Sequence, residues 1–150
     1  FNILKENTKN YQNIEVFNIG LGSQQKQERI FIRSWAPGDS TINVSSIERD
    51  EASFDKEETI TILKLDDFVK EKNISRIDFI KIDVEGYELE VLKGAIETIK
   101  KFRPILSVSL HKDEFKKEIE KFIKENDLNY YIEISIKDKN DIFLIPQNER

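Results

Sequence analysis

Two acids, a lysine and a glycine lie close together where an apolar stretch gives way to an amphipathic one: Lys81, Asp83, Glu85 and Gly86. The preceding residues, 77–83, are typical of a strand that is covered on both faces of an α/β sheet. In open α/β sheets the carboxyl ends of the strands line the ligand crevice. Packing alone does not account for three charged side chains at such an end, so we expect this segment to do chemistry.

Asp83 is the strongest candidate for a catalytic or cofactor-binding side chain. A carboxylate at a strand end can accept hydrogen bonds from the amine groups of a ligand, or take a proton from a reacting nucleophile. Glu85 lies on the same face of an extended strand and is a second candidate for such contacts. The alternative for both acids is structural, because carboxylates also satisfy free N–H groups at the start of a helix.

Two basic side chains are candidates for the same edge. Lys81 shares a strand face with Asp83, and it either forms an ion pair, orients Asp83 or contacts an acidic group of a substrate. His111, the only histidine, follows a second interior-type strand at 105–110. Parallel neighbouring strands would bring it to the same edge, and an imidazole titrates in a range that suits a general base. An exposed loop histidine is the alternative.

The elements that position these residues are predicted from apolar periodicity. One helix should follow the charged segment, because a single apolar stripe is formed by Leu89, Leu92, Ile96 and Ile99. A second surface helix is predicted at 114–126, and two strands at 130–136 and 141–145 close the chain. Strands that alternate with helices indicate a parallel α/β sheet, and the final hairpin adds an antiparallel pairing.

The first half of the chain is predicted to be less regular. The end of a helix is expected at 1–11, and a strand at 13–19 is expected to end at Gly20-Leu21-Gly22. Asp66 should cap a short helix at 67–72, since its carboxylate can accept from free backbone N–H groups.

An insertion of short strands and a loop is predicted over about 23–64. Its charged part, 48–58, is expected to be a loop, and its short strands are expected at 29–33, 41–44 and 59–65. We interpret residues 1–150 as a single domain, which is the natural expectation for a chain of this length.

The charged segment and the helix after it also carry a longer pattern, approximately K-x-D-(V/I)-E-G-x-E-x-x-(V/L)-L-x-G-A. The matching positions within this motif, 81–95, are Lys81, Asp83, Val84, Glu85, Gly86, Glu88, Val91, Leu92, Gly94 and Ala95. The motif resembles the signature of the FkbM family of S-adenosylmethionine-dependent methyltransferases. Weaker resemblance covers Leu65-Asp66-Asp67, Arg103-Pro104-Ile105-Leu106 and His111-Lys112, so most of the chain is similar to the family.

The resemblance implies a class I, Rossmann-like methyltransferase sheet that is mostly parallel with an antiparallel C-terminal strand. It implies S-adenosylmethionine as the cofactor and O-methylation of a hydroxyl on a small molecule or glycan, with an amine acceptor less favoured. The residues implied in catalysis are Asp83, His111, Glu85 and Lys81. The residues implied in cofactor binding are Asp83, Gly20 and Leu21.

Part of that fold is not found in the sequence. Class I methyltransferases open with a strand, a glycine-rich loop and a helix, whereas Gly20-Leu21-Gly22 is followed by a predicted strand. We therefore interpret the chain as the C-terminal portion of such a domain, without the N-terminal strand-loop-helix unit. We expect weak or no cofactor binding and little activity from the chain alone. Ser109 also stands where the family commonly has an acid, two residues before the histidine.

Composition argues against several other classes of protein. A net charge of −5, from 29 acids and 24 bases, argues against nucleic-acid binding. The absence of cysteine excludes disulfides and thiolate metal sites, and one histidine excludes a histidine-rich metal centre. No apolar run reaches the ~20 residues of a membrane span. We expect a cytoplasmic protein that acts on a small-molecule or glycan acceptor.

Two other functions stay open at this point. A degenerate, non-catalytic methyltransferase half could serve in assembly, since sheet edges left exposed promote self-association into a homo-oligomer. A Mg²⁺-dependent phosphate enzyme could use Asp83 and Glu85 as metal ligands, although the sequence shows neither a phosphate loop nor a third ligand.

Overall fold

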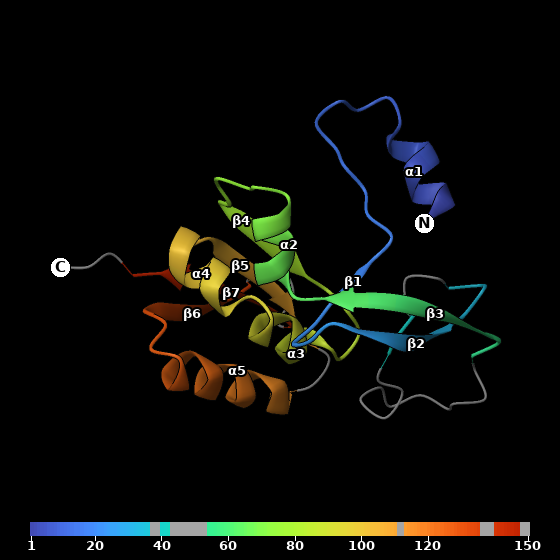
Figure 1. The fold of residues 1–150 in the computed structure, drawn as a ribbon. Coiled ribbons are helices and arrows are strands. Elements are labelled where there is room, and N and C mark those ends of the chain that lie inside the picture. The colour runs from blue at the N-terminus through green and yellow to red at the C-terminus, as the bar shows by residue number, and fades with distance from the viewer. Residues whose placement is uncertain (37–39, 43–53, 111–112, 136–139, 148–150) are drawn as a thin grey trace.

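The computed structural model describes residues 1–36, 40–42, 54–110, 113–135 and 140–147, and Figure 1 shows how its elements are arranged. Helices and two sheets make up these residues, which confirms the α/β class. The strands are β1 (Gly20–Leu21), β2 (Lys26–Ile32), β3 (Lys56–Leu63), β4 (Phe79–Ile82), β5 (Ile105–Ser109), β6 (Tyr130–Ile134) and β7 (Asp141–Pro146). The helices are α1 (Asn2–Thr8), α2 (Leu65–Glu71), α3 (Glu88–Lys93), α4 (Ile96–Phe102) and α5 (Asp113–Glu125). No helix within these ranges has the length and apolar character needed to cross a membrane.

The four-stranded sheet, with strand order β4-β5-β7-β6, carries the motif strand β4 at one edge. β4 pairs in parallel with β5, β7 runs antiparallel to β5, and β6 pairs antiparallel to β7. In this sheet β4, β5 and β6 therefore point the same way and β7 opposes them, which agrees with the predicted antiparallel C-terminal strand. The predicted hairpin of β6 and β7 forms, but its second strand lies against β5.

Helices α3, α4 and α5 cover one face of this sheet, and α5 runs along its lower side in Figure 1. They pack on alternate residues of the strands, as expected for a sheet whose side chains point to opposite faces in turn. The residues that are almost fully buried in this core include Leu92, Ile99, Leu106, Ile119 and Leu144.

The opposite face of the four-stranded sheet carries an apolar row that is partly open to solvent. The strand register places Phe79 beside Ile105 and Tyr131 beside Ile145, so that the row crosses all four strands. Phe79, Ile105 and Tyr131 are 53%, 39% and 43% exposed. The prediction that both faces of the motif strand are covered is therefore wrong for the described residues, because the helices of the core lie on the other side.

The single helix predicted after the motif strand is instead two helices, α3 and α4, separated at Gly94-Ala95. The break coincides with a close approach between two stretches of backbone. A Cβ atom on Gly94 would lie 1.9 Å from the carbonyl oxygen of Gly22, so only glycine fits. The Gly94 carbonyl in turn accepts a hydrogen bond from the backbone N–H of Asp66, at 3.0 Å.

Asp66 caps a different helix from the one predicted. Its carboxylate accepts from the backbone N–H groups of Glu97 (3.2 Å) and Thr98 (2.7 Å), at the start of α4. The N-cap residue of its own helix, α2, is Lys64. Asp66 thus joins α2 to the break between α3 and α4, which a reading of the local sequence could not show.

The N-terminal segment forms a helix as predicted, but the strand expected at 13–19 is wrong. β1 is confined to Gly20–Leu21, where it pairs in parallel with Ile62 and Leu63 of β3. Before that point the chain packs through side chains, with the edge of Phe17 against Phe68 at 4.9 Å between ring centroids. α1 has no buried residue and stands clear of the two sheets in Figure 1.

The predicted insertion forms a long antiparallel pair, β2 with β3, within a three-stranded sheet of order β1-β3-β2. Both strands are longer than predicted, because β2 and β3 pair continuously over their whole lengths. Residues 56–58, expected in a loop, belong to β3, while 48–53 lie outside the described residues. Thr41 pairs with Phe31 in an isolated bridge, and the rest of the strand predicted at 41–44 is described only to Ile42.

Tyr130 ties β6 to the start of β5. Its hydroxyl donates to the carbonyl oxygen of Pro104 at 2.9 Å. Burial raises the pKa of the Tyr130 phenol to about 12. The hydrogen bond explains how the polar end of a half-buried tyrosine is satisfied.

Candidate active site

Lys81 and Asp83 lie side by side at the carboxyl end of β4, as predicted. The Lys81 ammonium is 3.7 Å from Asp83 Oδ2, and the two side chains are 42% and 50% exposed. Neither Asp83 nor Glu85 caps the following helix, since the N-cap residue of α3 is Tyr87 and no side chain caps it. The structural alternative for Asp83 and Glu85 is therefore wrong as far as the N-cap of α3 is concerned.

Two further residues, Ser109 and Asp141, contact Lys81 at this edge. The sequence did not predict that they would lie together. Lys81 donates to the hydroxyl of Ser109 on β5 and lies 3.3 Å from Asp141 Oδ1 on β7. Ser109 donates to the same Asp141 oxygen. These hydrogen bonds, that of Ser109 first, hold the pKa of the Asp141 carboxyl below its ordinary value. The Ser109–Asp141 pairing depends on strand register, which the sequence does not reveal.

Glu85 contributes through its backbone to a strained turn. Its φ is 52° and that of Gly86 is 91°, so two successive residues adopt positive φ values between β4 and α3. Positive φ at a residue other than glycine is costly and is found where surrounding structure enforces it. The carbonyl oxygen of Glu85 accepts from the hydroxyl of Thr41 at 2.8 Å, and Thr41 is only 1% exposed. The insertion thus holds the motif turn in place.

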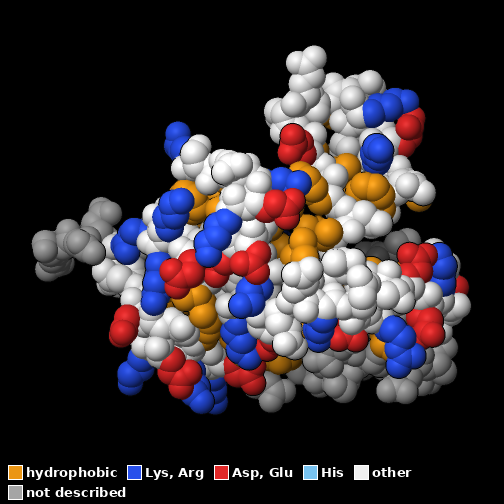
Figure 2. All heavy atoms as spheres, viewed as in Figure 1, with side chains coloured by type: hydrophobic (Ala, Val, Ile, Leu, Met, Phe, Trp, Pro, Cys, Tyr) orange, Lys and Arg blue, Asp and Glu red, His pale blue; other side chains and the backbone are white. Residues whose placement is uncertain are grey.

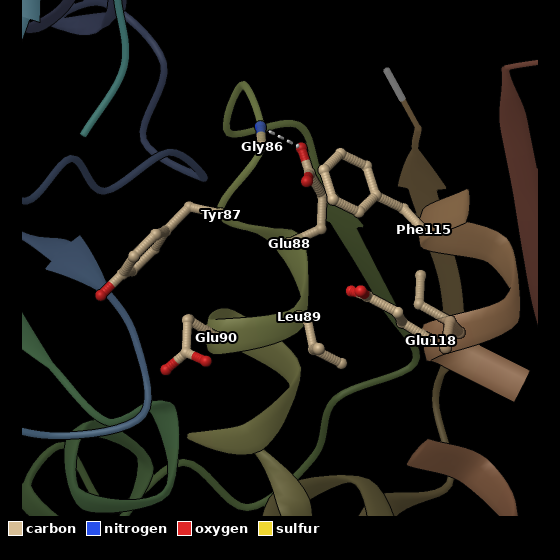
Figure 3. A pocket seen from close by; sticks show the side chains of 8 residues that line it. Gly86, Tyr87, Glu88, Leu89, Glu90, Phe115 and Glu118 are labelled. Atoms are coloured by element: carbon tan, nitrogen blue, oxygen red, sulfur yellow. Dashed lines mark hydrogen bonds between the residues drawn. The ribbon is translucent and has the colours of Figure 1, made fainter. Parts of the chain in front are cut away.

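Glu88, which sequence reasoning treated only as a motif position, also stabilises the turn. Its carboxylate accepts from the backbone N–H of Gly86 at 3.0 Å, the interaction dashed in Figure 3. Glu88 is 3% exposed, so this buried acid is part of the framework and not of the open edge. The signal that could have found it is the E-G-x-E spacing, which puts an acidic side chain two residues after the backbone N–H of the glycine.

A pocket of about 300 Å³ begins at this turn and lies between α3 and α5. In Figure 3 the Glu118 carboxylate and the Phe115 ring extend toward α3, while Tyr87 and Glu90 point away. The pocket is lined by Gly86, Tyr87, Glu88, Leu89, Glu90, Phe115, Glu118 and Ile119. An acid and an aromatic ring facing one cavity are suited to a polar organic ligand with apolar faces.

Glu90 fixes α3 to the loop that precedes β2. Its carboxylate accepts from Lys93 at 2.6 Å and from the hydroxyl of Ser23. The ammonium of Lys93 and then the Ser23 hydroxyl lower the pKa of the Glu90 carboxyl. Glu90 therefore fixes the position of α3, and its carboxylate points away from α5.

Gly20 and Leu21 form β1, an outer strand of the three-stranded sheet, and both are partly buried. Leu21 packs against the hydrophobic core, and a Cβ atom on Gly20 would lie 2.5 Å from Ile62 Cδ1. Close packing therefore accounts for Gly20, and its predicted contact with a cofactor stays a prediction. His111, the other predicted base, lies outside the described residues.

The residues that could hold a cofactor or metal can be judged from this geometry. Among the described residues, no group of three or more histidine, cysteine or acidic side chains is arranged to hold a metal ion. The exposed carboxylate of Asp83 suits an amine or hydroxyl of an organic cofactor. The described glycine run, Gly20-Leu21-Gly22, leads into β2 and not into a helix, so it offers no helix N-terminus to such a group.

Comparison with known proteins identifies the class of this chain. Residues 2–132 match the family model described as the methyltransferase FkbM domain. The chain is 29% identical over 91 residues to the hexuronic acid methyltransferase AglP of Haloferax volcanii, an alignment that covers 61% of this chain and 37% of that protein. Its fold is similar to the crystal structure of methyltransferase FkbM from Methylobacillus flagellatus, with a TM-score of 0.58 and 19% identity.

The structural alignment covers 95% of this chain and 32% of the other. The chain thus spans about a third of the length of each relative it matches here. The family model, in contrast, matches most of this chain and includes the whole motif, 81–95, with both acids at the end of β4. The chain belongs to the FkbM methyltransferase family.

Proposed function

We propose that the protein transfers the methyl group of S-adenosylmethionine to a hydroxyl of a small molecule or glycan. The observation that carries the proposal is the pair of Lys81 and Asp83 at the carboxyl end of β4, within a chain of a methyltransferase family. The similarity to a hexuronic acid methyltransferase supports a sugar acid as the acceptor.

The chemistry of methyl transfer explains the choice of residues. The bound donor supplies an electrophilic methyl group, and the acceptor hydroxyl must lose a proton as it attacks. A carboxylate beside that hydroxyl can take the proton, and positioning of the reacting atoms at ~3–3.5 Å supplies much of the rate. Asp83 is the described carboxylate placed to do this, and Lys81 offers a cation to an acidic group of the acceptor.

The described residues include groups that could contact part of a bound S-adenosylmethionine molecule. Asp83 and Glu85 are the carboxylates that would hold an amine or hydroxyl group of S-adenosylmethionine near the motif turn. The pocket between α3 and α5 begins at Gly86, close to Asp83 in the chain, and is the described cavity in which we place part of the acceptor.

The proposal is tested by incubating the purified full-length gene product with S-adenosylmethionine that carries an isotopically labelled methyl group. Glucuronic acid, galacturonic acid, glucose and catechol serve as probe acceptors, and mass spectrometry detects the labelled product. We expect methylation of a uronic acid, and Asp83→Asn should lower the rate about 10²-fold or more, the range for loss of a general base.

Asp78→Asn is the matched control for that substitution. Asp78 also pairs with a basic residue two positions earlier, Arg76 at 2.8 Å, but it precedes β4 instead of following it. Its side chain is 67% exposed, so the change should leave the rate unaltered. Labelled product formed equally well by Asp83→Asn and by the wild type would refute the role of Asp83.

A further inference from the structure

Three neighbouring strands bring polar side chains together on the exposed face of the four-stranded sheet. Ser109 of β5 stands opposite Asp141 of β7 in the strand register, and Lys81 of β4 reaches both. Lys81 donates to Ser109, and Ser109 donates to Asp141, so the hydrogen bonds run in one direction from the ammonium to the carboxylate. A chain of hydrogen bonds ordered in this way is strengthened by mutual polarisation.

This arrangement holds the Lys81 ammonium slightly apart from Asp83. The Lys81 nitrogen is 3.3 Å from Asp141 Oδ1 and 3.7 Å from Asp83 Oδ2, and the longer distance is beyond hydrogen-bond range. A hydroxyl can accept a hydrogen bond from an ammonium while it donates its own proton to a carboxylate. A distance of 3.7 Å leaves no room for an oxygen atom on the line between Lys81 and Asp83, but a hydroxyl beside the gap can contact both groups.

We propose that Asp141 is a positioning residue, which through Ser109 keeps the Lys81 ammonium from closing onto Asp83, so that the acceptor hydroxyl binds beside the gap and contacts both groups. The proposal rests on the proposed function, because it takes Asp83 as the side chain beside the acceptor. Without the Asp141 charge, Asp83 alone would attract the ammonium, and a direct ion pair would occupy the position of the hydroxyl.

The hydrogen-bond chain is tested by carboxyl NMR of the purified protein, which requires no substrate. The Ser109 hydroxyl is the main reason that the pKa of Asp141 lies below its ordinary value of 3.8. Ser109→Ala should therefore raise the pKa of Asp141, whereas Ser109→Thr keeps the hydroxyl and should leave it near the wild-type value. If the pKa of Asp141 does not respond to Ser109→Ala, the chain of hydrogen bonds does not exist in solution.

Asp141→Asn tests the consequence for Lys81. We expect the side-chain ammonium resonance of Lys81 to shift in Asp141→Asn and to stay unchanged in the control Asp78→Asn. In the labelled-methyl assay with glucuronic acid, Asp141→Asn should lower kcat by up to about 10²-fold, the cost of a misplaced reacting group, while KM for S-adenosylmethionine is retained. Ser109→Thr should restore the activity that Ser109→Ala loses.

The two readouts separate failure of this inference from failure of the proposed function. An unmoved Lys81 resonance in Asp141→Asn overturns the positioning role even if the enzyme methylates its acceptor. A kcat equal to that of the wild type also overturns it. A shifted resonance in a protein that transfers no methyl group to any probe supports the contact between Asp141 and Lys81, and it contradicts the proposed function instead.

Discussion

The acids of the motif divide between the open edge and the framework beneath it. Asp83 projects from the end of β4, with a side chain that is half exposed. Glu85 takes part through its carbonyl oxygen, and Glu88 is buried against the backbone of Gly86. Of these three closely spaced acids, Glu88 holds the turn through its side chain and Glu85 through its backbone. The carboxylates of Asp83 and Glu85 remain the candidates for contact with a ligand.

Asp66 provides a prediction at the scale of a single residue. Asp66→Ala removes the acceptor for two backbone N–H groups at the start of α4, so we expect the free energy of unfolding to fall by about 1–2 kcal/mol, as for other capping residues. Urea unfolding followed by circular dichroism measures the change. Asp67→Ala is the matched control, because Asp67 is the exposed neighbour in the same helix. Equal losses from the two variants would show that capping of α4 by Asp66 contributes nothing.

Residue types predicted part of the site but not its cross-strand partners. The prediction that Lys81 and Asp83 lie together is confirmed, since alternate residues of one strand share a face. Ser109 and Asp141 meet only because β7 enters between β5 and β6, and no local pattern specifies that order. For the same reason the local sequence predicts that Asp66 caps α2, whereas it caps α4. Contacts within one element are predictable from spacing, and contacts between elements need the topology.

At the scale of elements, the division of the predicted helix into α3 and α4 has a tertiary cause. The predicted apolar stripe is present: Leu92 and Ile99 are fully buried, and Leu89 and Ile96 pack against the same core while partly buried. What periodicity could not show is that the Gly22 backbone approaches Gly94 closely enough to exclude a side chain. The strand predicted at 13–19 failed for a related reason, because alternation favours a strand only where another strand is available to pair with it.

Gly94→Ala tests this close contact between backbones. The added Cβ would meet backbone atoms of Gly22, which cannot move aside cheaply, so we expect a loss of about 2–3 kcal/mol of stability or more. Gly20→Ala is the matched control, since its Cβ would meet only the side-chain tips of Ile62 and Ile60, which can rotate. Chemical denaturation should show a clearly larger loss of stability for Gly94→Ala than for Gly20→Ala. The reverse order would contradict the close contact between Gly94 and Gly22.

At the scale of the whole molecule, the four-stranded sheet has one covered face and one partly open face. The open face carries the apolar row that begins at Phe79, and β4 is also an edge strand with unpaired backbone groups. We propose that a second copy of the chain covers this row and edge at high concentration. Exposed apolar patches that join a free strand edge favour such association.

Sedimentation at increasing protein concentration tests the self-association. Ile105→Asp places a charge in the centre of the apolar row and should shift the protein toward the monomer. Ile3→Asp is the matched control, because Ile3 is 79% exposed on α1, away from the sheet. A protein that stays monomeric at all concentrations, or an equal response to both substitutions, would argue against this interface.

The hydrogen bond between Tyr130 and Pro104 gives the four-stranded sheet an intrinsic optical probe. The phenol ionises only at about pH 12 in the folded chain, so folding is favoured less and less as the pH rises from the ordinary value near 10 toward 12. In a variant whose other three tyrosines are replaced by phenylalanine, the phenolate absorbance of Tyr130 therefore reports whether β6 is still attached to the start of β5. The single tryptophan cannot serve this purpose, because Trp35 is 73% exposed in the turn after β2. A label-free measurement of this sheet is thus possible before any substrate is known.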